Sequence, residues 1–261
     1  MDVVAERSEV ERILEDPAYV VPEADAASNG PGDRFRASAS RFVNGATHAA
    51  RRHRLDVLLA GIDVDELSLD AAARTRAMLP AAIDEIAAQV PVACLAARLG
   101  FADPDAAPAW VAALAAHYPT GGPSSSADAA ATRLIAAADD VRGGLDGDLD
   151  GDAELRVQLL VQAHAATAGL IAAAVRLPAA RDGGVPTADL LAAVLRDALP
   201  VRQTKRLAPD GEVLVLRLDG ADHGSPHDPR TLAFGAGPRA CPAVRHAIAI
   251  ATAVVDEVRA C

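Results

Sequence analysis

The sequence predicts a mainly α-helical protein with a small β region. Hydrophobic residues make up 51% of its 261 residues and aromatic residues only 3%, so its apolar side chains are chiefly Ala, Leu and Val. This composition favours close-packed helices over an aromatic-rich β-sandwich. Apolar residues recur at helical spacing through most of the chain, whereas one stretch near residue 210 alternates as strands do. Because a chain of this length can bury one large core, we expect a single domain over residues 1–261.

Charge and cysteine content exclude several classes of function. The formal net charge is -11 and the longest basic run is RRHR at Arg51–Arg54, so no nucleic-acid partner is expected. Three scattered cysteines form no disulfide framework, which favours a reducing compartment. The N-terminal segment lacks the basic and apolar parts of a signal peptide, and no uncharged window is expected to span a membrane. We therefore expect a soluble, cytoplasmic protein.

The first predicted elements are a strand, a helix and a loop. DVVAE at Asp2–Glu6 has the composition of a short strand. The segment Ser8–Pro17 carries apolar residues at helical spacing, with Ser8 as the expected N-cap and Pro17 as the stop. The Gly, Pro, Asp and Ser residues of Pro22–Ser40 predict a loop, and a pattern typical of helices begins again near Arg41.

A layer of helices is predicted next, separated by turn residues. These helices are Thr47–Leu59, Leu69–Leu79, Ala81–Leu99, Ala107–Ala116 and Ala127–Asp139. The acidic, Gly-rich segment Asp140–Asp152 is interpreted as a linker. The following helix, Ala153–Leu177, is the most apolar in the chain, and we expect it to cross the interior.

The C-terminal part combines helices with a hairpin. After a helix at Thr187–Ala198, alternating residues flank an Asp-Gly turn at Asp210 and Gly211, which predicts a β-hairpin. The segment His223–Pro229 is interpreted as a loop, and the final helix is predicted at Val244–Val258. One stripe of that helix is expected to be buried, comprising Val244, Ile248, Ala251, Val255 and Val258.

The stretch FGAGPRACPA, Phe234–Ala243, carries the strongest chemical signal. Two glycines permit backbone conformations closed to other residues, and Pro242 suits the first turn of the final helix. Cys241 would then lie near a helix N-terminus with Arg239 beside it. The helix dipole and the guanidinium both favour thiolate over thiol, so Cys241 could ligate a metal or act as a nucleophile.

Two other interpretations apply to this stretch. Gly235, Gly237 and Ala240 match the G-x-G-x-x-[GA] pattern of dinucleotide-binding loops, but too little chain follows to form a βαβ unit. The stretch could also be a glycine turn with a buried, inert cysteine. Five matches to one longer pattern within this short window argue against the inert turn.

That longer pattern is F-G-x-G-x-R-x-C-x-G, and the stretch resembles the haem-binding loop of the cytochrome P450 family. Phe234, Gly235, Gly237, Arg239 and Cys241 match it, while an alanine replaces the final glycine. In that family the cysteine thiolate is the proximal iron ligand of haem b. The resemblance therefore implies a haem-binding domain in which Cys241 ligates the iron.

The resemblance extends over nearly the whole chain. The opening VVAERSEVERILEDPAYV is similar to the family's first strand and helix, and VPVACLAARLGF is similar to a later family segment. His48 and Arg52 match the family's H-x-x-x-R pair that reaches a haem propionate, and they share one helix face. Arg206 occupies the place of another propionate-binding arginine. Together with Arg239, the resemblance therefore implies four side chains that bind the two propionate carboxylates of haem.

The resemblance fails in two family signatures and in length. The helix text LLVQAHAATAGLI resembles the distal A-G-x-[ED]-T-T helix, but Ala165 replaces the acid and Ala166 the first threonine. Thr167 is the remaining hydroxyl and the candidate catalytic residue. The E-x-x-R motif keeps Arg196 but has Ala193 at the glutamate position. The chain is also well over a hundred residues shorter than typical members, so we expect a reduced fold.

The resemblance implies a haem-thiolate oxidoreductase of the cytochrome P450 type, a monooxygenase or peroxygenase. It would oxidise a small lipophilic or secondary-metabolite substrate with O2 or peroxide, and a ferredoxin with its reductase would supply electrons for O2. The alternative is a haem-binding sensor or carrier, or a non-catalytic scaffold that partners another enzyme. The retained Cys241 favours haem binding in either case.

Overall fold

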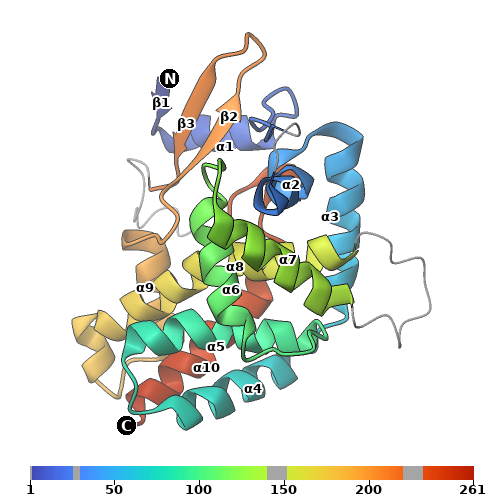
Figure 1. Ribbon diagram of the computed structural model, residues 1–261. Helices are drawn as coiled ribbons and strands as arrows, with labels where there is room; N and C mark the ends of the chain where they lie inside the picture. Colours follow the sequence, from blue (N-terminus) through green and yellow to red (C-terminus); the bar gives the residue numbers. More distant parts are fainter. Residues whose placement is uncertain (1, 26–29, 140–151, 220–231) are drawn as a thin grey trace.

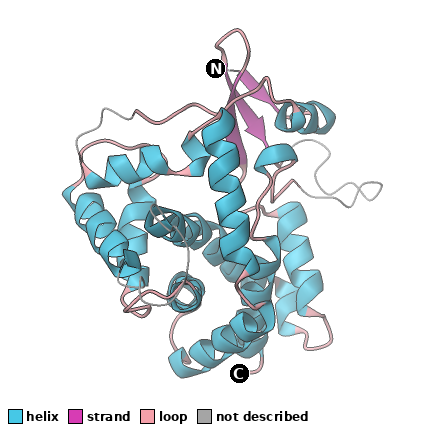
Figure 2. Ribbon diagram, turned by 90° about the vertical axis from the view of Figure 1, so that its right-hand side faces the viewer, coloured by secondary structure: helices cyan, strands magenta, loops and turns pink. Residues whose placement is uncertain are grey.

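A computed structural model of the protein describes residues 2–25, 30–139, 152–219 and 232–261. Helices form most of the molecule, and a small sheet lies with the first helix at one end (Figures 1 and 2). The prediction of a mainly helical fold with a small β region is confirmed. The predicted loop at 223–229 lies outside the described residues, as does most of the predicted linker at 140–152.

The α-helices agree with most of the predicted segments to within a few residues. They are α1 (Arg7–Glu15), α2 (Pro31–Ser38), α3 (Gly45–Ala60), α4 (Val64–Met78), α5 (Ile83–Arg98), α6 (Ala107–His117), α7 (Ser125–Asp139), α8 (Asp152–Arg176), α9 (Thr187–Asp197) and α10 (Val244–Arg259). Short 3-10 helices are η1 (Ser40–Phe42), η3 (Pro178–Arg181) and η4 (Gly237–Arg239).

The sheet has three strands in the order β1-β3-β2. β2 (Gln203–Leu207) and β3 (Val213–Arg217) form the predicted hairpin, and β1 (Asp2–Val4) pairs with β3 in parallel. Gly211 in the turn has φ +91°, a conformation that glycine adopts without strain. The N-terminal strand therefore closes the sheet against the C-terminal half of the chain.

Helix α8 lies at the centre of the main core. It packs against α5, α6, α7, α9 and α10. Its residues Ala153–Arg176 are long and apolar enough to cross a membrane, with a mean hydropathy of 1.4 over 18 residues. The expectation that no such window exists is thus wrong at this helix. Since 56% of that window is buried inside the protein, α8 has the burial of a core helix.

A second, smaller core lies between α1 and the sheet. Val10, Ile13 and Leu14 of α1 pack there with Leu216 of β3 and with Leu232, which precedes the Cys241 loop. The 3-10 helix η4 of that loop contacts α1. The loop that carries Cys241 is therefore anchored on the sheet side of the molecule while α10 continues into the main core.

Helix α2 corrects the predicted loop at Pro22–Ser40. Pro31 occupies its first turn and Gly32 N–H donates to the Asp128 carboxylate of α7 at 2.9 Å. Asp33 accepts a hydrogen bond from His117 Nε2 at 2.9 Å. These contacts come from residues far along the chain, so a local reading of composition could not reveal the helix.

Two helix starts also differ from prediction because carboxylates cap them. Glu6, not Ser8, caps α1 by accepting the backbone N–H groups of Ser8 and Glu9. Asp63 caps α4 in the same way, so that helix begins at Val64 rather than at Leu69.

The buried face of α10 differs from the predicted stripe. Val244, Ile248 and Val258 are only partly buried, whereas Ala251 and Val255 are buried as predicted. The remaining buried positions are His246, Ile250, Ala253 and Val254. Because α10 packs against α4, α5, α8 and α9, its burial extends around more than one stripe.

Candidate functional site

The Cys241 loop is a tight turn that requires its two glycines. Gly235 and Gly237 have φ +69° and +65°, and Cys241 N–H donates to the carbonyl oxygen of Phe234 at 2.7 Å. A Cβ atom at Gly237 would lie 2.5 Å from the backbone oxygen of Leu14 in α1. The motif glycines therefore serve both the turn and its close approach to α1.

The immediate surroundings of Cys241 favour the thiol, which is the opposite of the sequence expectation. Burial raises the pKa of the Cys241 thiol, and the N–H of Ala243 and the charge of Arg52 oppose this only in part. Helix α10 begins at Val244, so Pro242 precedes the helix instead of lying in its first turn. Ala243 has φ −102°, which explains why the motif's last glycine is dispensable here.

The guanidinium of Arg239 binds backbone and amide oxygens. It donates to the carbonyl oxygens of Ser40 (3.3 Å) and Val43 (2.7 Å) and to Asn44 Oδ1 (2.8 Å). Ser40 N–H in turn donates to Gln158 Oε1 of α8 at 2.8 Å. Arg239 therefore connects the Cys241 loop through η1 to α8.

Arg52 is the cation that the structure brings to the Cys241 loop. Its Nη1 donates to the carbonyl oxygen of Ala240 at 2.6 Å, and its Nε donates to Asp56 at 2.9 Å. Helix α3 is thereby joined to the loop one residue before Cys241. This contact explains why the charge that lowers the pKa of the thiol is that of Arg52 rather than Arg239.

The charges of three of the predicted propionate-binding groups act on the fourth, His48. Burial, followed by the charges of Arg239, Arg52 and Arg206, lowers the pKa of His48 to about 4. Burial, followed by the charges of Arg239 and Arg41, lowers the pKa of Arg206 to about 10. We call His48, Arg52, Arg206 and Arg239 the cation cluster. Burial is the larger cause of both shifts, and the charge contributions place these groups within electrostatic reach of one another.

Within the described residues, no carboxylate pairs with the most buried member of the cation cluster. Arg206 is 4% exposed and donates to the carbonyl oxygen of Lys205 at 2.9 Å. Arg239 likewise donates to neutral oxygen atoms alone among the residues that the structure describes. A buried cation without an anion is costly, so this arrangement suits an anionic ligand. Haem fits the donor set, because it offers two carboxylates to these cations and iron to a cysteine sulfur.

Helix α8 opens to the surface one turn after Gln158. Gln158 is 1% exposed, whereas Gln162 and Ala165 are exposed. His164 is half-buried and bonds the backbone of Ala88, so it faces α5. Thr167 is 4% exposed, which keeps its hydroxyl off the open face; its catalytic role stays a prediction.

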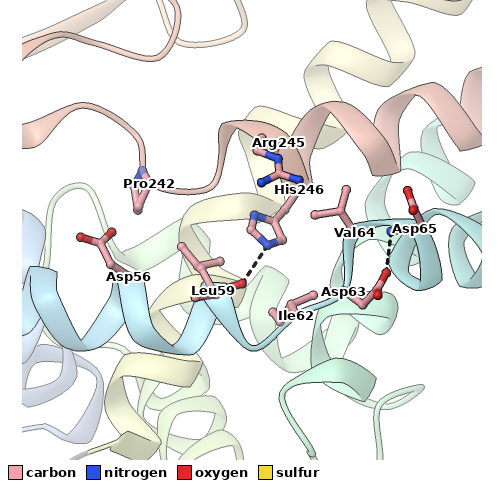
Figure 3. Close-up of a pocket in the computed structure, with 10 residues that line it drawn as sticks. Asp56, Leu59, Ile62, Asp63, Val64, Asp65, Pro242, Arg245 and His246 are labelled. Atoms are coloured by element: carbon pink, nitrogen blue, oxygen red, sulfur yellow. Dashed lines mark hydrogen bonds between the residues drawn. The ribbon is translucent and has the colours of Figure 1, made fainter.

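A surface pocket of about 440 Å³ lies on another side of the Cys241 loop, between α3, α4 and α10 (Figure 3). Pro242 and Arg245 line it together with the carboxylates Asp56, Asp63 and Asp65. Among the cation cluster, no member lines this pocket. Three carboxylates would repel propionates, so this pocket does not suit haem.

The partial E-x-x-R motif has no role in the site. Arg196 pairs with its neighbour Asp197 at 2.7 Å, and both side chains are about half exposed. The residues that sequence reasoning missed are Ser40, Asn44 and Gln158. Their hydrogen bonds to the site span more than a hundred residues, so no local pattern marks them.

Comparisons with known proteins identify the fold. No protein-family model matches the sequence, and no curated protein matches it. Among solved structures, P450BioI in complex with an acyl carrier protein ligated to hexadec-9Z-enoic acid matches with a TM-score of 0.76 and 17% identity, over 98% of this chain and 84% of that chain.

Two further solved structures agree with this match. A ligand-free cytochrome P450 of Mycobacterium smegmatis has a TM-score of 0.73 at 22% identity, over 99% of this chain and 83% of that chain. A cytochrome P450 of the archaeon Picrophilus torridus has a TM-score of 0.73 at 14% identity, over 99% of this chain and 88% of that chain. Identities this low support a conclusion about fold.

Proposed function

We propose that this chain, which has the cytochrome P450 fold, is a haem-thiolate oxidoreductase with Cys241 as the axial ligand of haem b. The observation that carries the proposal is the cation cluster beside the Cys241 loop, in which the buried Arg206 and the half-buried Arg239 meet no carboxylate among the described residues. When bound, haem supplies the redox chemistry with O2 or peroxide. Phe234 contributes the carbonyl that closes the loop.

The cation cluster would hold the two propionates. Arg206 and Arg239 neutralise them in a setting where burial strengthens charge-assisted hydrogen bonds. His48 is neutral at pH 7 and can donate through a ring N–H. Arg52 completes the set while it ties α3 to the loop.

Cys241 must lose its proton to ligate a metal, and burial opposes this. The N–H of Ala243 and the charge of Arg52 both favour the thiolate. The loop and helix α3 therefore each provide one group that stabilises the sulfur anion once a cation has displaced the proton.

The substrate is proposed to be small and lipophilic, such as a secondary-metabolite intermediate, because alanines dominate the open face of α8 at 162–169. Ala165 and Ala166 cannot donate protons, so water or a substrate group must do so. A ferredoxin and its reductase would deliver electrons for O2, whereas peroxide would need neither. Location in the cytoplasm and the absence of nucleic-acid and membrane partners remain part of the proposal.

The test is to purify the protein with haem supplied, reduce it and add carbon monoxide. A strongly red-shifted Soret band is expected, since thiolate ligation produces it. Cys241→Ser should abolish this band, whereas Cys261→Ser should keep it, because Cys261 is exposed at the chain end. Failure of the wild-type protein to take up haem would refute the proposal.

The alternative is a haem-binding sensor or carrier, or a scaffold for another enzyme. The loss of acid and hydroxyl at Ala165 and Ala166 is the observation that favours it. A haem-loaded protein that oxidises none of a panel of small lipophilic compounds, with peroxide or with reduced ferredoxin, would support this alternative over an enzyme.

A further inference from the structure

The amide of Gln162 is held on the part of α8 that opens to the surface. Val157, Leu160 and Val161 are 4% exposed or less, yet Gln162 is exposed at the next position. Ala165, three residues later on the same side of the helix, is exposed as well. Gln162 is therefore the polar residue at the start of an alanine-rich open face.

One contact orients this amide. Gln162 Nε2 donates to the hydroxyl oxygen of Tyr118 at 2.8 Å. Tyr118 is 5% exposed and packs against the rings of Phe35 and Phe42, with centroid distances of 6.0 and 5.1 Å. Its carbonyl oxygen also accepts a hydrogen bond from Arg36. A tyrosine held from several sides fixes the NH2 group, so the carbonyl oxygen of Gln162 points away from Tyr118.

The same face of α8 is joined to the Cys241 loop. Gln158 lies one helical turn before Gln162, and its Oε1 accepts the N–H of Ser40. The carbonyl oxygen of Ser40 accepts a hydrogen bond from Arg239, two residues before Cys241. The exposed amide of Gln162 therefore lies one helical turn from the residue that joins α8 to the Cys241 loop.

We propose that Gln162 is a specificity-determining residue whose side-chain oxygen accepts a hydrogen bond from a hydroxyl or amino group of the substrate. The inference rests on the proposed function and deepens it. Ala165 and Ala166, one turn later, offer no hydrogen bond, so one polar contact would orient an otherwise lipophilic molecule. The substrate class is then a small lipophilic alcohol or amine.

The test uses ligand pairs that share a carbon skeleton and differ in hydrogen-bond donation. Cyclohexanol is compared with cyclohexanone, indan-2-ol with indan-2-one, and borneol with camphor, by calorimetric binding to the haem-loaded protein. For at least one pair the alcohol should bind about three- to tenfold more tightly, as one net hydrogen bond predicts. Gln162→Leu should remove this preference.

A matched control makes the same change elsewhere. Gln89 is exposed on α5 and its amide bonds only Glu85 among the contacts described, so Gln89→Leu should leave the preference intact. Tyr118→Phe removes the acceptor that orients Gln162 Nε2, and the alcohol preference should fall while some remains.

Three outcomes would overturn the inference. They are no alcohol preference in any pair, a preference for the ketones, and a preference that Gln162→Leu leaves unchanged. The red-shifted Soret band is recorded on the same samples. If the band is present and the preference absent, only the inference on Gln162 fails; if the band itself is absent, the proposed function fails.

Discussion

The Cys241 loop and the open stretch of α8 at 162–169 are built in opposite ways. In the loop, hydrogen bonds hold backbone and side chains, and the cation cluster converges beside it. The α8 stretch is rich in alanine, and its polar contact is the amide of Gln162. The difference teaches that holding a charged cofactor and processing a substrate make separate demands. The charged groups beside the loop would bind the cofactor. On α8, the amide of Gln162 would contact the substrate, and water would supply the protons.

The largest effect is expected where the loop approaches α1. Gly237→Ala should lower the free energy of unfolding by about 2–4 kcal/mol, because positive φ is strained and the new Cβ would meet Leu14 backbone. Gly235→Ala is the matched control, since its φ is equally positive but its nearest neighbours lie at 3.8 Å. Denaturant unfolding measures both, and equal losses would show that the contact with α1 does not matter.

Substitution of Arg206 should weaken haem binding without lowering the stability of the cofactor-free protein. Arg206→Met should weaken haem binding about ten- to hundredfold, as loss of a charge-assisted hydrogen bond predicts. The cofactor-free protein should unfold no more easily, since the variant removes a buried, unpaired cation. Haem titration and thermal unfolding test the two halves.

Arg245→Met is the control for Arg206, because Arg245 is exposed on α10. It should change neither haem affinity nor stability. A loss of stability in cofactor-free Arg206→Met would contradict the ligand-binding role and make Arg206 a structural residue.

His48 should make the cofactor-free protein sensitive to acid. Its pKa is about 4 in the folded protein against 6.5 for a free histidine, so the unfolded chain binds more protons between these values. Stability should therefore fall as pH drops from 6.5 towards 4, and His48→Gln should weaken this dependence. Unfolding at pH 7 and pH 4.5 measures it.

Burial is the largest cause of the lowered pKa of His48, and the charges of three arginines lower it further. Haem should oppose this second contribution, because its propionates offset the arginine charges. An NMR titration of His48 should give a higher pKa in the haem-loaded protein. An unchanged value would mean that the carboxylates bind elsewhere.

The smallest effect is expected at Thr167 on α8. Thr167→Val removes the hydroxyl of a residue that is only 4% exposed and lies off the open face, so peroxide-driven turnover should change less than twofold. A tenfold decrease in kcat with unchanged stability would show that the hydroxyl takes part in the reaction. The α8 stretch would then, like the loop, depend on a buried polar group.

Sequence reasoning succeeded where the signal is local. The Asp210-Gly211 hairpin, the glycines of the Cys241 loop and the apolar core helix α8 each follow from turn chemistry or periodicity within a short window. Reasoning failed at α2, which is held by contacts to Asp128 and His117. It also predicted that the charge of Arg239 favours the Cys241 thiolate, whereas that guanidinium binds the Val43 carbonyl oxygen and the charge that lowers the pKa of the thiol is that of Arg52.

The sequence by itself determined the fold class and most of the elements, because these depend on residue type and spacing. The resemblance to the cytochrome P450 family supplied the candidate residues of the cation cluster. Only the tertiary structure decided that Arg206 and Arg239 meet no carboxylate among the described residues, that burial opposes the Cys241 thiolate, and that Gln162 rather than Thr167 is exposed. Burial and charge act through space. Their effect on a group depends on neighbours that can lie nearly two hundred residues away, as Arg239 and Asn44 do.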